Sequence, residues 1–211
     1  MSFEISVRRR LGHRDIGLNV TSDAPVTALV GPSGAGKTSI LNMIAGILRP
    51  DAGRIAVGGE TLFDNAARID LPPERRRAGY VFQDGRLFPH RDVRANLRYG
   101  ERLAPPEQRW IGYDEVVALL ALEALTGRWP ATLSGGEARR VAIGRALLSG
   151  ARFLLLDEPL TSLDAAHREQ MLGMIERIRD GFALPILYVS HQDDEVRRIA
   201  GRIVHLPVEP T

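Results

Sequence analysis

The sequence predicts an α/β fold with a parallel sheet, and three observations support this prediction. Short apolar runs with the length of buried strands recur along the 211 residues. One of them, residues 25–30, passes through a glycine-rich loop into residues 39–48, whose apolar side chains recur at helical spacing. Other runs each end on polar side chains. These side chains are Gln83 (GYVFQ), Asp157 and Glu158 (RFLLLDEP), and His191 (PILYVSH).

Composition predicts one compact domain, because a chain with 44% hydrophobic residues can bury a full core. No apolar run reaches the ~18 residues of a membrane span, and the start of the chain does not have the pattern of a signal peptide. Cysteine is absent, which excludes disulfides and cysteine-based zinc sites, and the five histidines lack ligand spacing. We therefore expect a cytoplasmic protein in which oxygen ligands hold any metal ion.

The charge balance gives little support to nucleic-acid binding. The formal net charge is +2, and the calculated pI of 9.4 reflects the predominance of arginine. Arginines cluster at residues 8–10 and 75–77, and we interpret the clusters as a solvated strand edge and a solvated loop. A patch that binds a phosphate backbone is the minority alternative.

The glycine-rich loop, Gly31 to Thr38 (GPSGAGKT), matches G-x-x-x-x-G-K-[ST] in full. It contains Lys37, the only lysine among the 28 basic residues, which indicates a position that requires a compact ammonium. In such a loop the backbone N–H groups hold phosphates, the lysine bridges the β- and γ-oxygens, and the threonine hydroxyl binds Mg²⁺. The alternative is an ordinary glycine-rich turn. The apolar residues expected on the following helix, before Pro50, are Ile40, Leu41, Ile44, Ile47 and Leu48.

The polar groups at the strand ends are expected to meet this loop, since ligands of open parallel sheets bind beyond the carboxyl ends of the strands. Asp157 is placed for a Mg²⁺ contact through water, and Glu158 for a general base that polarises the attacking water. His191 is expected to contact the γ-phosphate or to hold that water. Taken singly, the acidic pair also fits a helix N-cap, and the histidine also fits a core or surface position.

A second phosphate-binding turn, Leu133 to Glu137 (LSGGE), precedes the helical run ARRVAIGRALL. Its serine hydroxyl and glycine N–H groups form an anion-binding helix start, and they also cap the helix. The phosphate loop already supplies one such site for the nucleotide at Lys37. The turn is therefore expected to hold the nucleotide of a second subunit.

Taken in order, these motifs and the SLD triplet at residues 162–164 resemble the nucleotide-binding subunits of ATP-binding cassette (ABC) transporters over nearly the whole chain. The resemblance implies a phosphate-loop NTPase core, residues 1–83 and 151–211, with an N-terminal antiparallel β portion. It implies a helical subdomain at residues 84–150. It also implies a head-to-tail homodimer that encloses two molecules of ATP with Mg²⁺ and hydrolyses them.

The resemblance assigns roles to individual residues. The expected catalytic residues are Glu158 and His191, and the expected metal contacts are Thr38, Gln83 and Asp157. The expected nucleotide contacts are Gly31, Pro32, Ser33, Gly34, Ala35, Gly36, Lys37, Thr38, Ser39, Gln83, Ser134, Gly135, Gly136, Glu137 and Asp164. Within residues 84–150, the run DEVVALLALEAL is expected to turn inward Val116, Val117, Leu119, Leu120 and Leu122.

The stretch from Leu71 to Gly100 is similar to the ATPase subunits of bacterial molybdate importers. This likeness implies import of molybdate, or of a related oxyanion such as tungstate, with a membrane permease and a periplasmic solute-binding protein. The subunit would lie peripherally on the cytoplasmic face of the inner membrane, with no nucleic-acid partner. Gln83 would report nucleotide occupancy to the permease, and Leu87 and Phe88 are candidates either for the docking surface or for the core.

Two features depart from the family pattern. Molybdate ATPases commonly continue into a C-terminal oxyanion-binding domain, whereas this sequence ends at Thr211, so direct feedback by molybdate is not expected. The family usually stacks an aromatic residue on adenine, and the only candidates are Phe3 and His13, so weak discrimination between bases is expected. Three alternatives stay open: import of a different solute, a soluble ABC ATPase acting on nucleic acid or ribosomes, and a nucleotide-gated clamp with negligible turnover.

Overall fold

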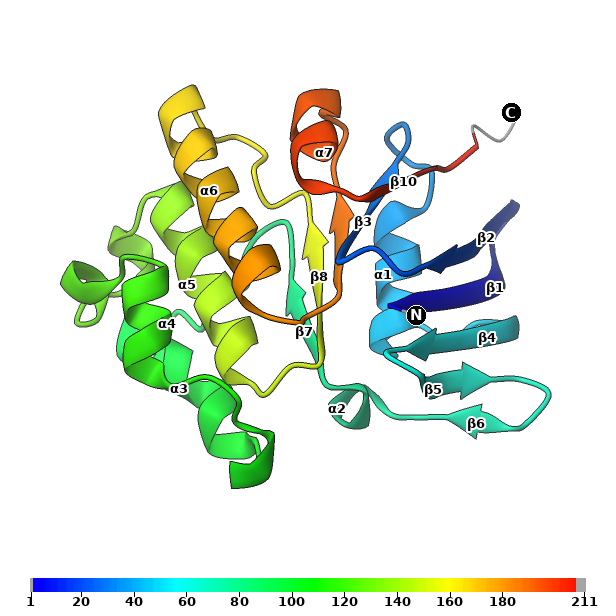
Figure 1. Ribbon diagram of the computed structural model, residues 1–211, viewed down its shortest axis with the longest axis horizontal. Coiled ribbons are helices and arrows are strands. Elements are labelled where there is room, and N and C mark those ends of the chain that lie inside the picture. Colours follow the sequence, from blue (N-terminus) through cyan, green and yellow to red (C-terminus); the bar gives the residue numbers. More distant parts are fainter. Residues whose placement is uncertain (1, 208–211) are drawn as a thin grey trace.

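Two sheets and the helices packed on them build the molecule (Figure 1). The computed structural model describes residues 2–207. One sheet is parallel and the other is antiparallel. The α-helices are α1 (Lys37–Ala45), α2 (Pro73–Arg76), α3 (Val93–Leu103), α4 (Tyr113–Leu119), α5 (Gly135–Leu148), α6 (Ala165–Gly181) and α7 (Asp193–Ile199).

The parallel sheet is covered on both faces. Its strands, in spatial order, are β10 (Arg202–His205), β3 (Val26–Val30), β9 (Ile186–Val189), β8 (Phe153–Asp157) and β7 (Ala78–Val81). Every residue of β8 and β9 is buried, as parallel strands between two layers require. Alternate residues of β8 enter different cores, because Leu154 packs with α5 and α6 whereas Leu155 packs with α1. The predicted α/β fold is confirmed.

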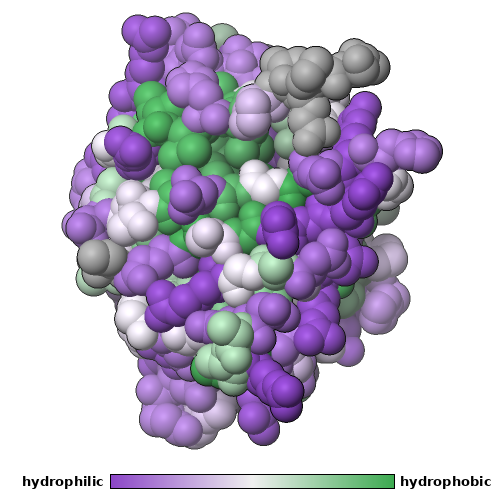
Figure 2. Space-filling model, turned by 90° about the vertical axis from the view of Figure 1, so that its right-hand side faces the viewer, coloured by the Kyte–Doolittle hydropathy of each residue, from purple (hydrophilic) through white to green (hydrophobic). Residues whose placement is uncertain are grey.

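The antiparallel sheet lies on the other side of α1. Its strands, in spatial order, are β2 (Arg14–Ser22), β1 (Phe3–Leu11), β4 (Ala52–Val57), β5 (Glu60–Asp64) and β6 (Ile69–Asp70). Phe3, Ile5 and Val7 are buried and alternate with more exposed neighbours, so one face of β1 packs against α1. Figure 2 shows this side of the molecule, on which apolar residues gather in the upper half among hydrophilic ones. The expected N-terminal antiparallel portion is therefore present.

Residues 84–150, all of which the structure describes, hold helices and no strand. Besides α3, α4 and α5 they contain three short 3₁₀ turns, Pro106–Gln108, Glu123–Leu125 and Pro130–Thr132. Helix α4 ends at Leu119 because Ala121 adopts a left-handed conformation with φ of 48°. The inward-facing prediction is confirmed by the buried residues Val116, Val117, Leu120 and Leu122, and Leu119 is half-buried against the same core.

No helix within residues 2–207 combines the length and the hydrophobicity that crossing a membrane requires.

Helix α1 is shorter than predicted. It ends at Ala45, and Gly46 follows in a left-handed conformation with φ of 81°. The Gly46 N–H caps the helix by donating to the carbonyls of Asn42 and Met43. Ile47 and Leu48 therefore lie beyond the helix, so their predicted place within it is wrong, and Ile47 is 56% exposed.

The arginine cluster at residues 75–77 is not a solvated loop. Arg75 is exposed, but Arg76 is fully buried and Arg77 is half-buried. The Arg76 guanidinium donates to the carbonyls of Met43 and Ile44, at 2.8 and 3.1 Å, and so satisfies the C-terminal end of α1. A buried guanidinium with these partners is a structural element rather than part of a nucleic-acid surface.

Candidate nucleotide site

The phosphate loop connects the end of β3 to the start of α1. Gly36 is the N-cap of α1 and has φ of 84°. A Cβ atom at Gly36 would lie 2.7 Å from the Ile16 side chain, so β2 holds the loop closely and leaves room only for glycine. The Lys37 ammonium donates to the carbonyls of Gly31 and Pro32, at 2.7 and 2.9 Å. The cation is thus held inside the loop, at the N-terminus of a helix, where phosphate groups are favoured.

Thr38 and Asp157 bring the loop and the end of β8 together. The Thr38 hydroxyl donates to Asp157 Oδ2 at 2.9 Å across 119 residues of sequence. Asp157 is buried, and its burial raises the pKa of the carboxyl, while the hydrogen bond from Thr38 opposes the rise. Mg²⁺ prefers oxygen ligands, and a hydroxyl and a carboxylate that lie side by side supply them. These residues therefore fit the metal that the sequence predicts.

Glu158 and His191 meet at the ends of β8 and β9. His191 Nδ1 lies 3.4 Å from Glu158 Oε2, and the Thr161 hydroxyl donates to the same oxygen at 3.0 Å. The backbone N–H of Glu158 donates to the carbonyl of Val189 at 3.0 Å, which ties its main chain to β9. Glu158 has φ of 46°, a conformation that is uncommon outside glycine. The two residues predicted to be catalytic are therefore in contact.

Arg139 supports the turn that carries Glu158. Its guanidinium Nη1 donates to the Glu158 carbonyl at 2.9 Å, and Nη2 donates to the Thr161 carbonyl at 3.3 Å. Sequence reasoning singled out neither Arg139 nor Thr161. For Thr161, its position three residues after Glu158 is a usable signal, because that spacing suits a side-chain hydrogen bond within a turn. No sequence pattern points to the contact of Arg139, which depends on how α5 packs beside β8.

A buried network holds the turn that carries His191. The carboxylate of Glu195 accepts hydrogen bonds from the hydroxyls of Tyr188 and Ser190, at 3.0 and 2.8 Å. The Ser190 hydroxyl in turn accepts from the backbone N–H of Gln192 at 3.0 Å. Burial raises the pKa of the Tyr188 phenol, so it remains a donor to the carboxylate. The imidazole of His191 is left exposed beside this fixed turn.

Gln83 lies two residues beyond the end of β7 and is exposed. The backbone that follows it is fixed by Arg145 of α5, which donates to the carbonyls of Gly85 and Arg86 at 3.0 and 2.7 Å. Further along, the fully buried side chain of Asn96 accepts from the Phe88 N–H at 2.8 Å and donates to the Phe88 carbonyl at 3.1 Å. The segment after Gln83 is therefore clamped by α3 and α5.

The LSGGE turn caps α5. Ser134 is the N-cap, and its hydroxyl accepts from the Glu137 N–H at 3.2 Å. Glu137 completes a capping box by accepting from the Ser134 N–H at 2.7 Å, and its other oxygen lies 3.1 Å from Arg128. The hydrogen bond from the Ser134 backbone lowers the pKa of Glu137. Both carboxylate oxygens of Glu137 are thus engaged within the chain.

Apart from Gln83, the predicted site residues form two separate groups. The first joins the phosphate loop, Asp157, Glu158 and His191 through the contacts above. The second comprises the turn at residues 134–137 and Asp164, which caps α6 by accepting from the His167 N–H at 2.9 Å. Within residues 2–207 no hydrogen bond or ion pair joins the 134–137 turn to the phosphate loop.

Comparison with known proteins gives a family match and curated relatives. The family model described as ABC transporter matches residues 14–161. The molybdenum import ATP-binding protein ModC of Rhodospirillum rubrum is 54% identical over 201 residues, which are 95% of this chain and 54% of that protein. The proteins of the same name from Brucella melitensis and Rhizobium etli are 57% and 50% identical, over 96% and 98% of this chain and 56% and 58% of their own lengths. The chain therefore spans about half the length of these relatives.

Solved structures share the fold. A structure described as a dimeric form of MJ0796, a bacterial ABC transporter cassette, superposes with a TM-score of 0.76 at 24% identity, over 96% of this chain and 92% of that one. A dimeric post-hydrolysis state of the same cassette, bound to ADP and phosphate, gives a TM-score of 0.74 at 25% identity over the same shares of the two chains. The ABC ATPase fold expected from the sequence is confirmed.

Proposed function

This chain belongs to the ABC transporter family, and we propose that it binds ATP with Mg²⁺ and hydrolyses it to drive import of molybdate or a related oxyanion. The observation that carries the proposal is the hydrogen bond between Thr38 and Asp157. It joins a complete phosphate loop to the strand end where the carboxylate chemistry is expected. A glycine-rich turn with no nucleotide role would not need to meet a buried acid there.

The phosphate loop accounts for ATP binding. Its N–H groups and the start of α1 hold the β- and γ-phosphates, and Lys37 moves from its carbonyl partners onto the phosphate oxygens. Thr38 and Asp157 would hold Mg²⁺, and Gln83 would be a further contact. When bound, Mg²⁺ neutralises the charge that develops on the phosphates.

Glu158 and His191 account for hydrolysis. Glu158 accepts a proton from water as the water oxygen attacks the γ-phosphorus, and the bond to the β-γ bridging oxygen breaks to release ADP. His191 lies on the same carboxylate and holds the water and the γ-phosphate in line. The left-handed turn at Glu158 and the hydrogen bond from Thr161 orient the carboxylate before the reaction begins.

The LSGGE turn is proposed to act on the nucleotide of a second copy. It has the donors of an anion site, and within residues 2–207 it makes no hydrogen bond or ion pair with the phosphate loop of its own chain. A head-to-tail dimer places Ser134, Gly135 and Gly136 over the partner's γ-phosphate, with Asp164 beside the join. Both similar cassette structures are described as dimeric, which supports this arrangement. Glu137 acts as a cap in the arrangement seen here, and a contact with the nucleotide would require it to leave Arg128.

A groove beside the segment after Gln83 is proposed to receive the permease. It has a volume of about 400 Å³, and its lining includes Phe88, Tyr99 and Leu103. Leu103 is 70% exposed. Exposure of a large apolar side chain to water is unfavourable, and such side chains often lie where another protein surface covers them. Of the two sequence candidates, Phe88 belongs to this groove, whereas Leu87 packs against the core. The helical subdomain, residues 84–150, would thus carry the docking surface, at the cytoplasmic face of the inner membrane.

The transported solute is inferred from relatives. Proteins named for molybdenum import are 50% to 57% identical to this chain, which supports molybdate over an unrelated solute. Oxyanion import of this type also requires a periplasmic solute-binding protein. The assignment of the solute depends on this likeness.

The proposed function is tested by Glu158→Gln, which keeps the shape of the side chain and removes the base. With ATP and Mg²⁺ this variant should sediment as a dimer, and without nucleotide it should sediment as a monomer. Glu115→Gln on the exposed side of α4 is the matched control and should hydrolyse ATP like the native chain. A Glu158→Gln variant that stays monomeric with saturating ATP and Mg²⁺ would contradict the proposal.

A further inference from the structure

A second cavity lies at the end of the parallel sheet opposite the nucleotide site. It has a volume of about 510 Å³. Arg152 precedes β8, and Pro185 precedes β9, so the cavity lies at the amino ends of both strands. Asp157 and the start of the His191 turn lie at the carboxyl ends. The length of β8 alone therefore separates the two sites by about 13 Å.

Two aromatic side chains form an apolar wall of this cavity. Trp110 and Phe182 both line it, and their ring centroids are 5.2 Å apart with the planes tilted by 59°. The indole N–H of Trp110 donates to the Ala151 carbonyl at 2.8 Å, which fixes the ring. The side chain still remains 38% exposed, so part of the ring is open to a ligand. A rigid indole offers contact area to a ligand at little entropic cost.

Both charged side chains that line the cavity are arginines. Among the residues that the structure describes, the lining includes Arg77 and Arg152 and no acidic residue. Arg77 is anchored by two hydrogen bonds from its guanidinium to the Gly150 carbonyl, at 3.0 and 2.7 Å, and burial lowers its pKa. Arg152 is half-exposed and forms an ion pair with Glu60, outside the lining. An anion entering the cavity would therefore meet two guanidinium groups held in place.

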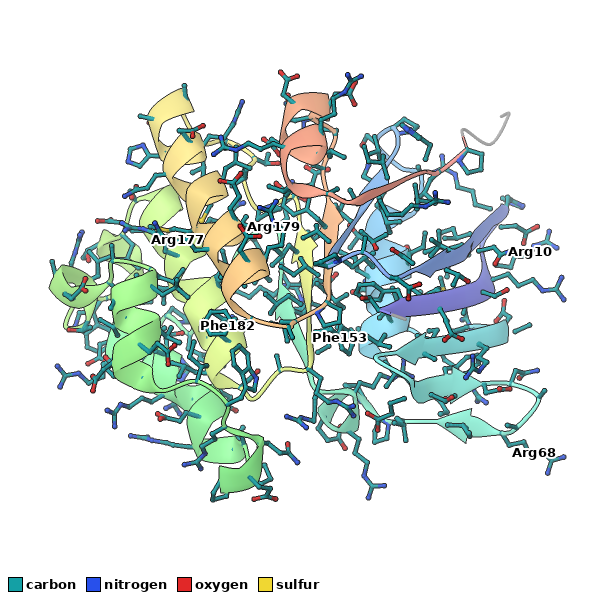
Figure 3. The ribbon with its side chains drawn as sticks, viewed as in Figure 1. Arg10, Arg68, Phe153, Arg177, Arg179 and Phe182 are labelled. Carbon is teal, nitrogen blue, oxygen red and sulfur yellow. The ribbon has the colours of Figure 1, made fainter. Side chains whose placement is uncertain are left out.

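The cavity also joins three parts of the fold. Val57 and Gly58 come from the end of β4, Trp110 from the segment between α3 and α4, and Phe182 from the end of α6. Figure 3 shows Phe182 at the lower end of α6 and Phe153 at the start of β8. A volume within the usual range of small-molecule sites, mostly apolar walls and a few fixed polar groups are the attributes of a ligand pocket.

We propose that this cavity binds a small organic anion with a flat apolar body, which lies against Trp110 while its acidic group meets Arg152 and Arg77. The aromatic wall selects for the flat body, and the guanidinium groups select for a carboxylate or sulfonate. The ligand would connect the helical segment to the sheets at a site that the nucleotide does not share.

The test uses the aromatic sulfonate anilinonaphthalene sulfonate as the probe. The chain has two tryptophans, so Trp129→Phe leaves Trp110 as the only tryptophan emitter. Titration of this variant should quench the Trp110 emission to saturation. The change Arg152→Gln should raise the apparent Kd about fivefold, which is the effect of losing one partly exposed charge contact. In the protein that keeps both tryptophans, binding followed by the emission of the probe itself should give the same Kd.

Arg68→Gln is the matched control, because Arg68 projects from the far edge of the antiparallel sheet (Figure 3). It should leave the Kd unchanged, and saturating ATP with Mg²⁺ should not displace the probe. Three results would overturn the proposal: no saturable quenching of Trp110, equal Kd values for Arg152→Gln and the native residue, or displacement of the probe by ATP. None of these results would affect the proposed ATPase function.

Discussion

The Arg139 guanidinium on α5 donates to the main-chain carbonyl of Glu158, with 2.9 Å between Nη1 and the oxygen. Burial lowers the pKa of Arg139, because the cation is removed from water to make this contact. Glu158 holds a left-handed backbone conformation that costs energy in any residue with a side chain. The helix that begins at the LSGGE turn therefore supports the turn that aims the proposed catalytic carboxylate.

Replacing Arg139 with Met should lower ATP turnover without abolishing nucleotide binding. The change removes the hydrogen bonds to the carbonyls of Glu158 and Thr161, and the carboxylate loses its fixed direction. A loss of about tenfold to a hundredfold in single-turnover rate is expected from misplacement on the scale of an ångström. The Kd for ATP should stay within about twofold, since the phosphate loop is untouched.

The neighbouring residue provides the control for this experiment. Arg140→Met removes a guanidinium that donates to the carbonyls of Leu120 and Ala121, remote from Glu158. This variant should keep most of the native turnover. If both substitutions reduce turnover equally, Arg139 acts only through the general stability of α5, and the positioning role is wrong.

Replacing Asp157 with Asn should stabilise the nucleotide-free protein and eliminate Mg²⁺-dependent hydrolysis. Burial raises the pKa of Asp157, so at neutral pH folding must bury a charge that the amide lacks. The Thr38 hydroxyl can still donate to the amide oxygen. The melting temperature should rise by a few degrees, since each 1 kcal/mol corresponds to about 2–4 °C in a chain of this size.

The pH dependence of this stabilisation follows from the direction of the shift. A carboxyl whose pKa is raised in the folded state favours folding when it is protonated, and this contribution is lost as the pH rises through the folded pKa. The advantage of Asp157→Asn should therefore shrink as the pH falls toward about 4, the value of an unfolded aspartate. Asp164→Asn is the control, because hydrogen bonds from His167 lower the pKa of Asp164, and it should not raise the melting temperature.

Replacing Arg76 with Met should destabilise the protein by about 3 kcal/mol, because the carbonyls of Met43 and Ile44 would stay buried without their donor. Its guanidinium donates to the carbonyls of Leu71, Met43 and Ile44 and to Asp70, at 2.7 to 3.1 Å. The adjacent and exposed Arg75→Met should change stability by less than about 0.5 kcal/mol. Urea unfolding measures both, and similar values for the two variants would contradict the assigned role.

Discrimination between ATP and GTP should be weak, with dissociation constants within about threefold of each other, less than the roughly 1 kcal/mol that aromatic stacking contributes. Phe3 cannot stack on a base, because it is fully buried against Phe153 in an edge-on contact at 6.3 Å. His13 is exposed in the turn before Arg14, whose guanidinium donates to the Gly34 carbonyl at 3.2 Å. Competition binding measures the ratio, and a strong preference for ATP would disprove the prediction.

The sequence was sufficient for features that depend on local pattern. The phosphate loop, the strands that end at Asp157 and near His191, and the inward face of α4 follow from motif and periodicity, and the structure places them as predicted. Local pattern gave a wrong prediction where a single residue ended an element before the apolar spacing did. Gly46 ends α1 early and exposes Ile47, although the apolar spacing continues to Leu48.

Features that depend on tertiary packing could not be predicted from one sequence. Arg76 belongs to a run of three arginines that looks solvated, and only the fold brings the end of α1 to it. Arg139 and Arg145 likewise act on carbonyls of other segments, which no spacing in their own helix reveals. The boundaries of the helical subdomain at residues 84 and 150 stay a prediction.

Uptake of labelled molybdate in cells that lack this protein directly tests whether the chain drives molybdate import. The cells are complemented with the native chain or with Glu158→Gln, and expression of both is checked. Only the native chain should restore uptake, because the proposed import requires hydrolysis at Glu158. If the native chain is expressed and hydrolyses ATP but restores no uptake, the assignment to molybdate import is wrong.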